Sequence, residues 1–485
     1  MDKHKEEQLL YRISELIKEN KDLNRQIKKL SAEKNQLTRE RDKLENLIAQ
    51  YAPEHLPRDL DTSLKARSLK FEMATVLYAD LQGIKKIARD SSSFDIMDEL
   101  DNIFLVFNNI VKKYKIEKIK TIGDDYMCAG GVPSKNITNP IDVVLAAMEM
   151  QDYMNKLQHE YASQQRAFWD FRIGIHTGPV TANYYGRKKI SYDLKGDTVH
   201  IATRIASASD CGEINISIMT YELVKQYFNC DYNGTIPVKY KGNMEMLRMK
   251  RIKPGFAVNR RVGRKPNSIF MIKYLLRQFT DLQEMVLDRL EKELPAHLYY
   301  HNVKHTIDVV NQAELIGYGE GVDDEAILLL KTAALFHDAG HMIGYDNHEF
   351  YGTQLAKEYL PGFKYNQEQI DRICDLIMAT QTPPSPQNLL EKIMCDADLD
   401  YLGRSDFIPV SNTLYEELKE QEKINDLNEW NKLQLKFISG HQYFTETALS
   451  LREVNKQKQI ERIKSLLEEE KGDSPNSKSQ VPNSK

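Results

Sequence analysis

The first fifty residues carry a seven-residue hydrophobic repeat. Leucine stands at every seventh position from Leu9 to Leu44, and half of the positions four residues farther on are isoleucine. This a/d spacing is typical of a coiled coil, and leucine at d with isoleucine at a favours two parallel strands. Asn20 at one a position would fix the register. We therefore predict a parallel homodimeric coiled coil over residues 1–50, followed by a proline-containing linker at 51–70.

The hydrophobic pattern changes twice beyond this linker. Between residues 71 and 253, short apolar runs alternate with amphipathic helical stretches, which indicates an α/β or α+β domain. A basic segment with Gly and Pro at 254–267 is the expected linker to residues 268–470, where helical patterns dominate and predict an all-α domain. The polar, low-complexity residues 471–485 are expected to be disordered.

Composition narrows the classes of protein that this sequence can encode. A chain of 485 residues is long enough for two or three domains. The net charge of -4 disfavours nucleic acid or anionic lipid as the main partner, although local basic residues must be judged site by site. Five scattered cysteines without a CxxC pair fit a reducing cytoplasm, and we expect no membrane span because no apolar run approaches the ~20 residues required.

Two acidic residues stand where strands are expected to end. Asp80 closes the apolar run MATVLYAD, and Asp124 follows Gly123 in KTIGDDYM, where glycine suits a tight turn between two strands. Magnesium is held in proteins by one or two carboxylates together with the phosphates of the substrate. The two acids could therefore hold Mg²⁺ or Mn²⁺ beside a nucleoside triphosphate.

Residues 71–253 resemble the catalytic domains of class III adenylyl and guanylyl cyclases. The resemblance rests on five motifs in order: YADLQG, EKIKTIGDDYM, FRIGIHTGPV, SYDLKGDTVHIATRI and VKYKGN. It implies a ferredoxin-like βαββαβ core that pairs head to tail with a second copy around two clefts. It further implies metal binding by Asp80 and Asp124, purine binding by Lys120 and Asp193, transition-state stabilisation by Arg204, and binding of the terminal phosphates by Lys241. His200 replaces the asparagine that orients the ribose in most members, and could still donate a hydrogen bond.

The purine-binding pair predicts which base is used. A lysine donor with a carboxylate acceptor matches adenine N1 and the exocyclic amine, whereas guanine presents the opposite pattern. Lys120 with Asp193 therefore favours ATP as the substrate. Because one chain carries both halves of a cleft, a two-fold homodimer would form two sites through its cyclase faces and coiled coil.

The C-terminal part contains a group of potential metal ligands. LYYHNVKHTIDVV, LFHDAGHMIG and IMCDADLDYLG bring together histidine and aspartate in a pattern that suits Zn²⁺, Mn²⁺, Fe²⁺ or Mg²⁺. These motifs resemble the HD superfamily of metal-dependent phosphohydrolases, which implies the ligands His305, His337, Asp338 and Asp398, with His341 and His348 as possible additional residues of the site. YHNVKH and QLKFI look like segments of class I cyclic-nucleotide phosphodiesterases. That likeness implies His301 as the acid for the leaving oxygen, and Gln434 and Phe437 as purine contacts.

These interpretations of the two domains lead to one principal hypothesis on function and two alternatives. The principal one is an adenylate cyclase joined to an HD domain that hydrolyses a phosphoester, with cyclic AMP itself as one candidate substrate. In the second, the HD phosphohydrolase is the main activity and the cyclase-like domain is its nucleotide-binding regulator. In the third, a dimer senses nucleotides without catalysis. Release of pyrophosphate from ATP would separate the first from the other two.

Overall fold

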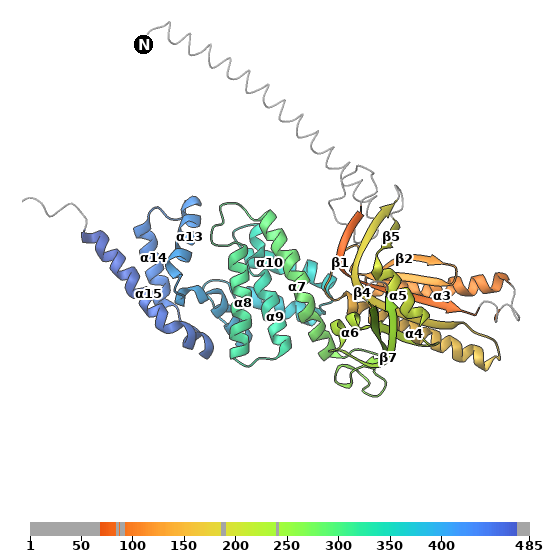
Figure 1. The fold of residues 1–485 in the computed structure, drawn as a ribbon. Coiled ribbons are helices and arrows are strands. Elements are labelled where there is room, and N and C mark those ends of the chain that lie inside the picture. Colours follow the sequence, from red (N-terminus) through yellow and green to blue (C-terminus); the bar gives the residue numbers. More distant parts are fainter. Residues whose placement is uncertain (1–67, 84–86, 88–92, 186–190, 239–241, 473–485) are drawn as a thin grey trace, which may run out of the picture. The chain divides into compact units, whose positions relative to one another are not determined.

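The computed structural model describes residues 68–83, 87, 93–185, 191–238 and 242–472 (Figure 1). The predicted coiled coil, most of the linker after it, Lys241, and the C-terminal residues from 473 lie outside this part of the chain. The chain divides into two compact units. The first holds the described residues up to Lys135 together with Asn139–Val224 and Cys230–Met249. The second holds Asn136–Thr138, Lys225–Asn229 and the described residues from Lys250 onwards.

The first unit begins with a ferredoxin-like core. Its elements are β1 (Ser68–Gln82), α3 (Ser93–Lys113), β2 (Glu117–Ile122), β3 (Asp125–Gly130), α4 (Asn139–Ser163) and β4 (Asp170–Tyr185). The strands lie in the order β2-β3-β1-β4, and every neighbouring pair is antiparallel. This is the βαββαβ arrangement that the resemblance to the cyclases implied.

Six further elements extend this core. They are β5 (Ser191–Lys195), α5 (Asp197–Ser207), β6 (Ile214–Ser217), α6 (Ile218–Val224), β7 (Phe228–Val238) and β8 (Gly242–Ile252). The sheet continues beyond β4 through β6 and β8 to β7, and β5 pairs with β4. On the central strand β1, the consecutive residues Val76 and Leu77 are both buried, so this strand is covered on both faces.

A glycine in β4 fixes the position of α5 against the sheet. Any Cβ on Gly174 would collide with the backbone of Ala202 and Ala206 in α5. Ile201 and Ile205 of the same helix are buried. The close approach that glycine permits therefore leaves the opposite face of α5 exposed.

The second unit is helical, as predicted. Its longer elements are α7 (Ser268–Glu293), α8 (Val303–Gly319), α9 (Asp324–Phe336), α10 (His348–Tyr359), α11 (Gln367–Met378), α12 (Leu389–Asp398), α13 (Phe407–Glu420), α14 (Leu427–Gly440) and α15 (Glu446–Gly472). Several helices begin at asparagine or aspartate caps. Asn302, for example, accepts hydrogen bonds from the backbone of Lys304 and His305 at the start of α8. None of the described helices is both long and apolar enough to cross a membrane.

Candidate active sites

Acidic side chains of the first unit gather where β1 ends and β2 turns into β3. Asp80 is paired in register with Asp125, the first residue of β3. Asp124 lies in the preceding turn, where Gly123 has φ 61°. Burial raises the pKa of Asp80, and the carboxylates of Asp125 and Asp124 raise it further. Crowded carboxylates of this kind fit a divalent cation, because the cation would offset their mutual repulsion.

Arg172 connects this acidic group to the end of α5. It is the residue of β4 that pairs with Asp80, and its Nε lies 3.9 Å from Asp80 Oδ2. Gln82 accepts a hydrogen bond from Arg172 Nη2 at 2.7 Å and donates one to Asp80 Oδ2 at 2.8 Å. Arg172 Nη1 donates to the carbonyls of Ser207 and Ser209, where α5 ends. Sequence reasoning did not select Arg172, although an arginine between the apolar residues Phe171 and Ile173 of an expected strand was a usable signal.

The structure brings the predicted purine-binding pair together. Lys120 on β2 and Asp193 on β5 are 73 residues apart in the sequence, and Lys120 Nζ donates to Asp193 Oδ1 at 3.4 Å. Their side chains are 40% and 35% exposed, so a ligand can reach both. Within the described residues, no hydrogen bond or ion pair connects this pair to the acidic group around Asp80.

The predicted transition-state residues lie on the exposed face of α5. His200 and Arg204 are one helical turn apart, and both are exposed. Arg204 Nη1 donates to the carbonyl of Pro237 at 2.6 Å. The two side chains therefore stand where a ligand or a second protein copy could meet them. Lys241 lies outside the described residues, so its predicted contact with phosphate stays a prediction.

Four predicted metal ligands of the second unit converge on one point. His305 comes from the first turn of α8, His337 and Asp338 follow the end of α9, and Asp398 ends α12. His305 Nε2 lies 3.3 Å from Asp338 Oδ2 and 3.3 Å from Asp398 Oδ1. His337 Nε2 lies 3.2 Å and 3.4 Å from the same two oxygens. His337 Nδ1 donates to the Ala334 carbonyl at 2.8 Å, which leaves Nε2 as the ligand atom.

The four side chains are arranged to bind a cation rather than to hydrogen-bond with one another. Asp338 Oδ2 is buried and accepts no well-formed hydrogen bond from the described residues, despite the two imidazole nitrogens beside it. Burial alone would lower the pKa of His305 and His337, but Asp338 and Asp398 raise it above its usual value. Two imidazoles and two carboxylates facing one point are a common ligand set for zinc, manganese or iron.

A second group of donors surrounds the other oxygen of Asp338. His348 Nε2 lies 3.4 Å from Asp338 Oδ1, and His341 Nε2 lies 4.0 Å from it. The rings of His341 and His348 stack with centroids 4.0 Å apart. Neither ring nitrogen of the buried His341 has a hydrogen-bond partner among the described residues, and burial lowers its pKa to about 3. Asp338 can therefore serve two adjacent cations, one through each oxygen.

The side chain of His301 also reaches this second group, and a buried glutamate orients it. His301, Asp338 and His341 have ligand atoms within 4.8 Å of one another. Glu417 on α13 accepts from His301 Nδ1 at 2.6 Å through Oε1, and from the backbone N–H groups of Tyr300 and His301 through Oε2. Burial would raise the pKa of Glu417, but these hydrogen bonds lower it below its usual value. Sequence reasoning missed Glu417, because 116 residues separate it from His301.

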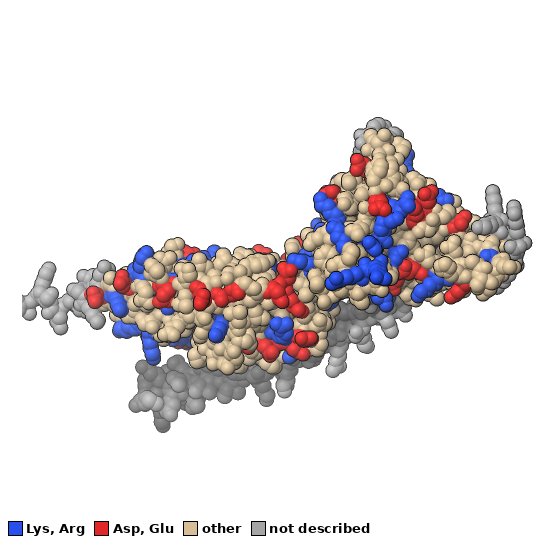
Figure 2. Space-filling view, turned by 90° about the horizontal axis from the view of Figure 1, so that it is seen from below, with Lys and Arg blue, Asp and Glu red and all other residues tan. Residues whose placement is uncertain are grey.

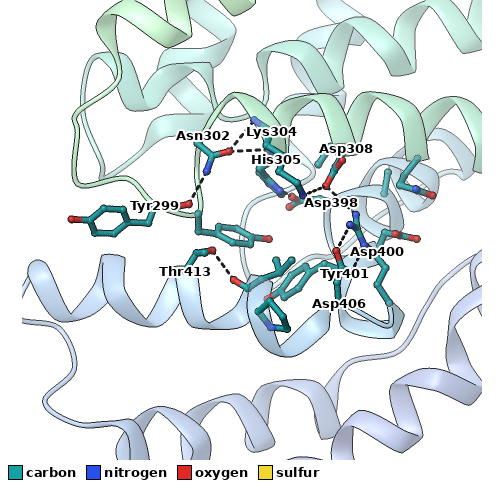
Figure 3. Close-up of a pocket in the computed structure, with 17 residues that line it drawn as sticks. Tyr299, Asn302, Lys304, His305, Asp308, Asp398, Asp400, Tyr401, Asp406 and Thr413 are labelled. Atoms are coloured by element: carbon teal, nitrogen blue, oxygen red, sulfur yellow. Dashed lines mark hydrogen bonds and ion pairs between the residues drawn. The ribbon is translucent and has the colours of Figure 1, made fainter.

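A pocket of about 280 Å³ opens beside the ligand cluster. Figure 3 shows His305 and Asp398 together in its wall, with Tyr401 and Lys304 also lining it. Its volume is near the lower end of the range for small-ligand pockets, about 300 Å³. Gln434 and Phe437 on α14 do not line this pocket. Gln434 is buried and Phe437 is 37% exposed, and their predicted contact with a purine stays a prediction.

Comparisons with known proteins match the two parts of the chain that carry these residues. Residues 67–251 match the family model described as Adenylate and Guanylate cyclase catalytic domain, and residues 302–400 match the HD domain. The chain thus contains a catalytic domain of the adenylate and guanylate cyclase family and a domain of the HD family.

Individual relatives match the cyclase portion. The chain is 30% identical to "Guanylate cyclase 2G" of Rattus norvegicus over 226 residues, which is 46% of this chain and 20% of that protein. It is 29% identical to "Adenylate cyclase" of Mycobacterium tuberculosis over 231 residues, 47% of this chain and 49% of that protein. The adenylyl cyclase CyaB from P. aeruginosa has a solved structure with a TM-score of 0.35 and 26% identity, covering 38% of this chain and 95% of that one. The chain thus spans half or less of the length of these two curated relatives.

Proposed function

We propose that this chain converts ATP into 3′,5′-cyclic AMP and pyrophosphate, and that its HD domain hydrolyses a phosphodiester, with cyclic AMP as the first candidate. The observation that carries the cyclase proposal is the closeness of Asp80 to Asp124 in a domain of the cyclase family: Leu81, the residue after Asp80, donates its N–H to the Asp124 carbonyl at 3.2 Å, and the Asp124 carboxylate raises the pKa of Asp80. The accessible Lys120–Asp193 pair supports ATP over GTP. The names of the relatives do not decide this choice, since they include both guanylate and adenylate cyclases.

Each of these side chains has a separate role in the proposed cyclase reaction. Asp80 and Asp124 would hold Mg²⁺ or Mn²⁺, which when bound offsets the charge of the triphosphate. Lys120 donates to adenine N1, and Asp193 accepts from the exocyclic amine. The ribose 3′-oxygen attacks the α-phosphorus in line, its hydroxyl proton is released, and the bond to pyrophosphate breaks. Arg204 stabilises the charge that develops during this step, as a preorganised donor.

Two copies of the chain would be needed to form a cleft. The acidic group and the Lys120–Asp193 pair belong to separate contact networks in the first unit, and His200 and Arg204 lie on an exposed helix face. A two-fold dimer places the acids of one copy opposite the purine-binding and transition-state residues of the other, and does so twice. The coiled coil predicted over residues 1–50 would hold the two copies together.

The HD domain would cleave a phosphodiester by acid-assisted hydrolysis. His305, His337, Asp338 and Asp398 fit one cation of the zinc, manganese, iron or magnesium type, which when bound activates water and offsets phosphate charge. Water adds to phosphorus, the bond to the 3′-oxygen breaks, and His301 supplies the proton that the leaving oxygen takes up. Glu417 holds the His301 ring through Nδ1 and so directs Nε2 away from itself.

The proposal is tested by incubating the purified full-length chain with ATP or GTP and Mn²⁺ or Mg²⁺. Cyclic AMP and pyrophosphate should accumulate in equal amounts from ATP, once hydrolysis of the product by the HD domain is prevented with His337→Ala. Asp80→Ala and Asp124→Ala should abolish the product, whereas Asp98→Ala, at an exposed acid of α3, should not. Metal-dependent hydrolysis by the native chain with no pyrophosphate from ATP would instead support an HD phosphohydrolase regulated by its cyclase domain.

A further inference from the structure

The end of β8 and the segment that connects it to α7 concentrate positive charge. Residues 250–267 contain seven Lys and Arg residues and no acid, although the whole chain has a net charge of -4. The sequence pattern suggested a linker at 254–267, but this segment is an ordered part of the second unit. Figure 2 shows Lys and Arg side chains gathered in one area of the face seen from below. Residues 250–267 are therefore strongly basic, although the net charge of the whole chain is slightly negative.

Backbone hydrogen bonds hold this basic loop in one shape. The Val258 N–H donates to the backbone carbonyl of Lys265 at 3.0 Å, and the Gly263 N–H donates to the backbone carbonyl of Asn259 at 2.8 Å. The side chain of Asn259 also accepts from the N–H groups of Arg261 and Val262. Gly263 has φ 64°, a conformation that favours glycine. The tip of the loop is thus preorganised and loses little freedom when it binds a partner.

Aliphatic side chains at the tip face solvent among the cations. Val258 is 70% exposed and Val262 is 56% exposed, and Arg260 and Arg261 between them are also exposed. Ile269, in the first turn of α7, is 53% exposed. No ion pair to an acidic side chain is found for Arg260 or Arg261 among the described residues. Exposed apolar groups flanked by arginine combine the two attractions that peripheral proteins use at an anionic bilayer.

The exposed side chains favour a lipid surface over a nucleic acid. Binding of single-stranded nucleic acid generally uses exposed aromatic rings on which bases stack. Here the partly buried Phe256 packs against Tyr227 and Phe270, with ring centroids 5.7 Å and 6.3 Å away. The tip itself offers valines, which can enter the headgroup region but cannot stack on bases.

We propose that the 250–267 loop is a docking site for an anionic lipid bilayer. The cations Arg260 and Arg261 would lie at the headgroups, while Val258 and Val262 enter the interface between them. Each cation near such a surface strengthens binding about fivefold, and salt weakens the attraction. This inference is independent of the activity of either catalytic domain.

The test is sedimentation of the full-length chain with vesicles of phosphatidylcholine, alone or mixed with phosphatidylserine. The native chain should sediment only with the mixed vesicles, and less at high salt. Arg260→Glu with Arg261→Glu should reduce binding by at least about tenfold. Lys458→Glu with Lys464→Glu, the same change of charge at exposed positions of α15, should leave it unchanged. Circular dichroism checks that each variant is folded.

A second double variant separates the apolar contribution to binding from the electrostatic one. Val258→Ser with Val262→Ser keeps every charge, and should weaken vesicle binding several-fold while leaving its salt dependence in place. The proposal is wrong if the native chain does not sediment with the mixed vesicles, or if the α15 control variant loses as much vesicle binding as the arginine variant of the loop. It is also wrong if the valine variant binds normally and a labelled oligonucleotide competes with the vesicles, since that result identifies a polyanion site for nucleic acid.

Discussion

Replacing Glu417 with glutamine should disable proton transfer by His301 while leaving the metal ligands in place. The native carboxylate accepts a hydrogen bond from the imidazole at 2.6 Å and two from backbone N–H groups at 3.0 Å and 3.2 Å, and the Tyr345 hydroxyl also hydrogen-bonds to it. A glutamine keeps only one oxygen. If that oxygen faces the backbone, its NH₂ group opposes the Nδ1–H of His301, and if the amide flips, the NH₂ group opposes two backbone donors.

The size of the effect follows from the bond that is lost. A hydrogen bond to a charged group contributes about 1.5–3 kcal/mol, which corresponds to roughly 10- to 150-fold in the population of the correctly oriented, protonated ring. Removal of a partner that orients a functional histidine typically costs about 10- to 100-fold in activity. We therefore expect kcat for cyclic AMP hydrolysis to fall by about 10- to 100-fold in Glu417→Gln.

A comparison of two substrates separates proton transfer from general damage. The 3′-oxygen of cyclic AMP needs a proton as it leaves, whereas the nitrophenolate of bis(p-nitrophenyl) phosphate leaves without one. Glu417→Gln should therefore slow hydrolysis of cyclic AMP far more than hydrolysis of the nitrophenyl ester. Glu416→Gln, at the exposed neighbouring position on α13, is the matched control. Equal losses on both substrates would refute the reasoning, as would normal hydrolysis of cyclic AMP.

Three other predictions concern base choice, pH and metal content. The double variant Lys120→Glu with Asp193→Cys should shift the ratio of kcat/KM for ATP and GTP towards GTP by at least about tenfold. If the variant still binds triphosphate and its preference is unchanged, another residue determines which base is bound. Burial raises the pKa of Glu117 from 4.5 to about 7. Between pH 4.5 and about pH 7 the folded chain therefore keeps a proton that the unfolded chain releases, so the free energy of unfolding falls as the pH rises through this range. Because this side chain is partly exposed, Glu117→Gln should raise the free energy of unfolding by only about 1 kcal/mol at pH 8 and by nothing at pH 4, which urea titrations can check. His337→Ala should lose bound metal in elemental analysis, whereas His301→Ala should keep the cation of the His305–Asp398 group, and unchanged metal in the first variant would reject that ligand set.

The sequence pattern predicted most of the first unit correctly because its strands and helices obey local periodicity. The run MATVLYAD, expected to be a strand ending at Asp80, lies in β1, and Gly123 forms the expected turn between β2 and β3. The meeting of Lys120 with Asp193 was reached through family resemblance, because nothing in a period of two or 3.6 residues relates positions 73 apart.

The features that were missed depend on tertiary contacts. Arg172 becomes significant only when β4 pairs with β1 and brings it opposite Asp80. Glu417 is an ordinary helix residue in the sequence, and only the packing of α13 against the start of α8 makes it a partner of His301. The 254–267 segment has the Gly and Pro content of a linker, yet its hydrogen bonds fold it into a fixed loop.

The central claim is that cyclic AMP is made at clefts to which two copies of this chain contribute different residues. Two inactive variants, Asp80→Ala and Arg204→Ala, test it when they are co-expressed with different tags and the heterodimer is purified. One of its two clefts then contains Arg204 from the first chain and Asp80 from the second, so the heterodimer should recover about half of the native rate of cyclic AMP formation from ATP. A verified, folded heterodimer that forms no cyclic AMP would contradict the shared cleft.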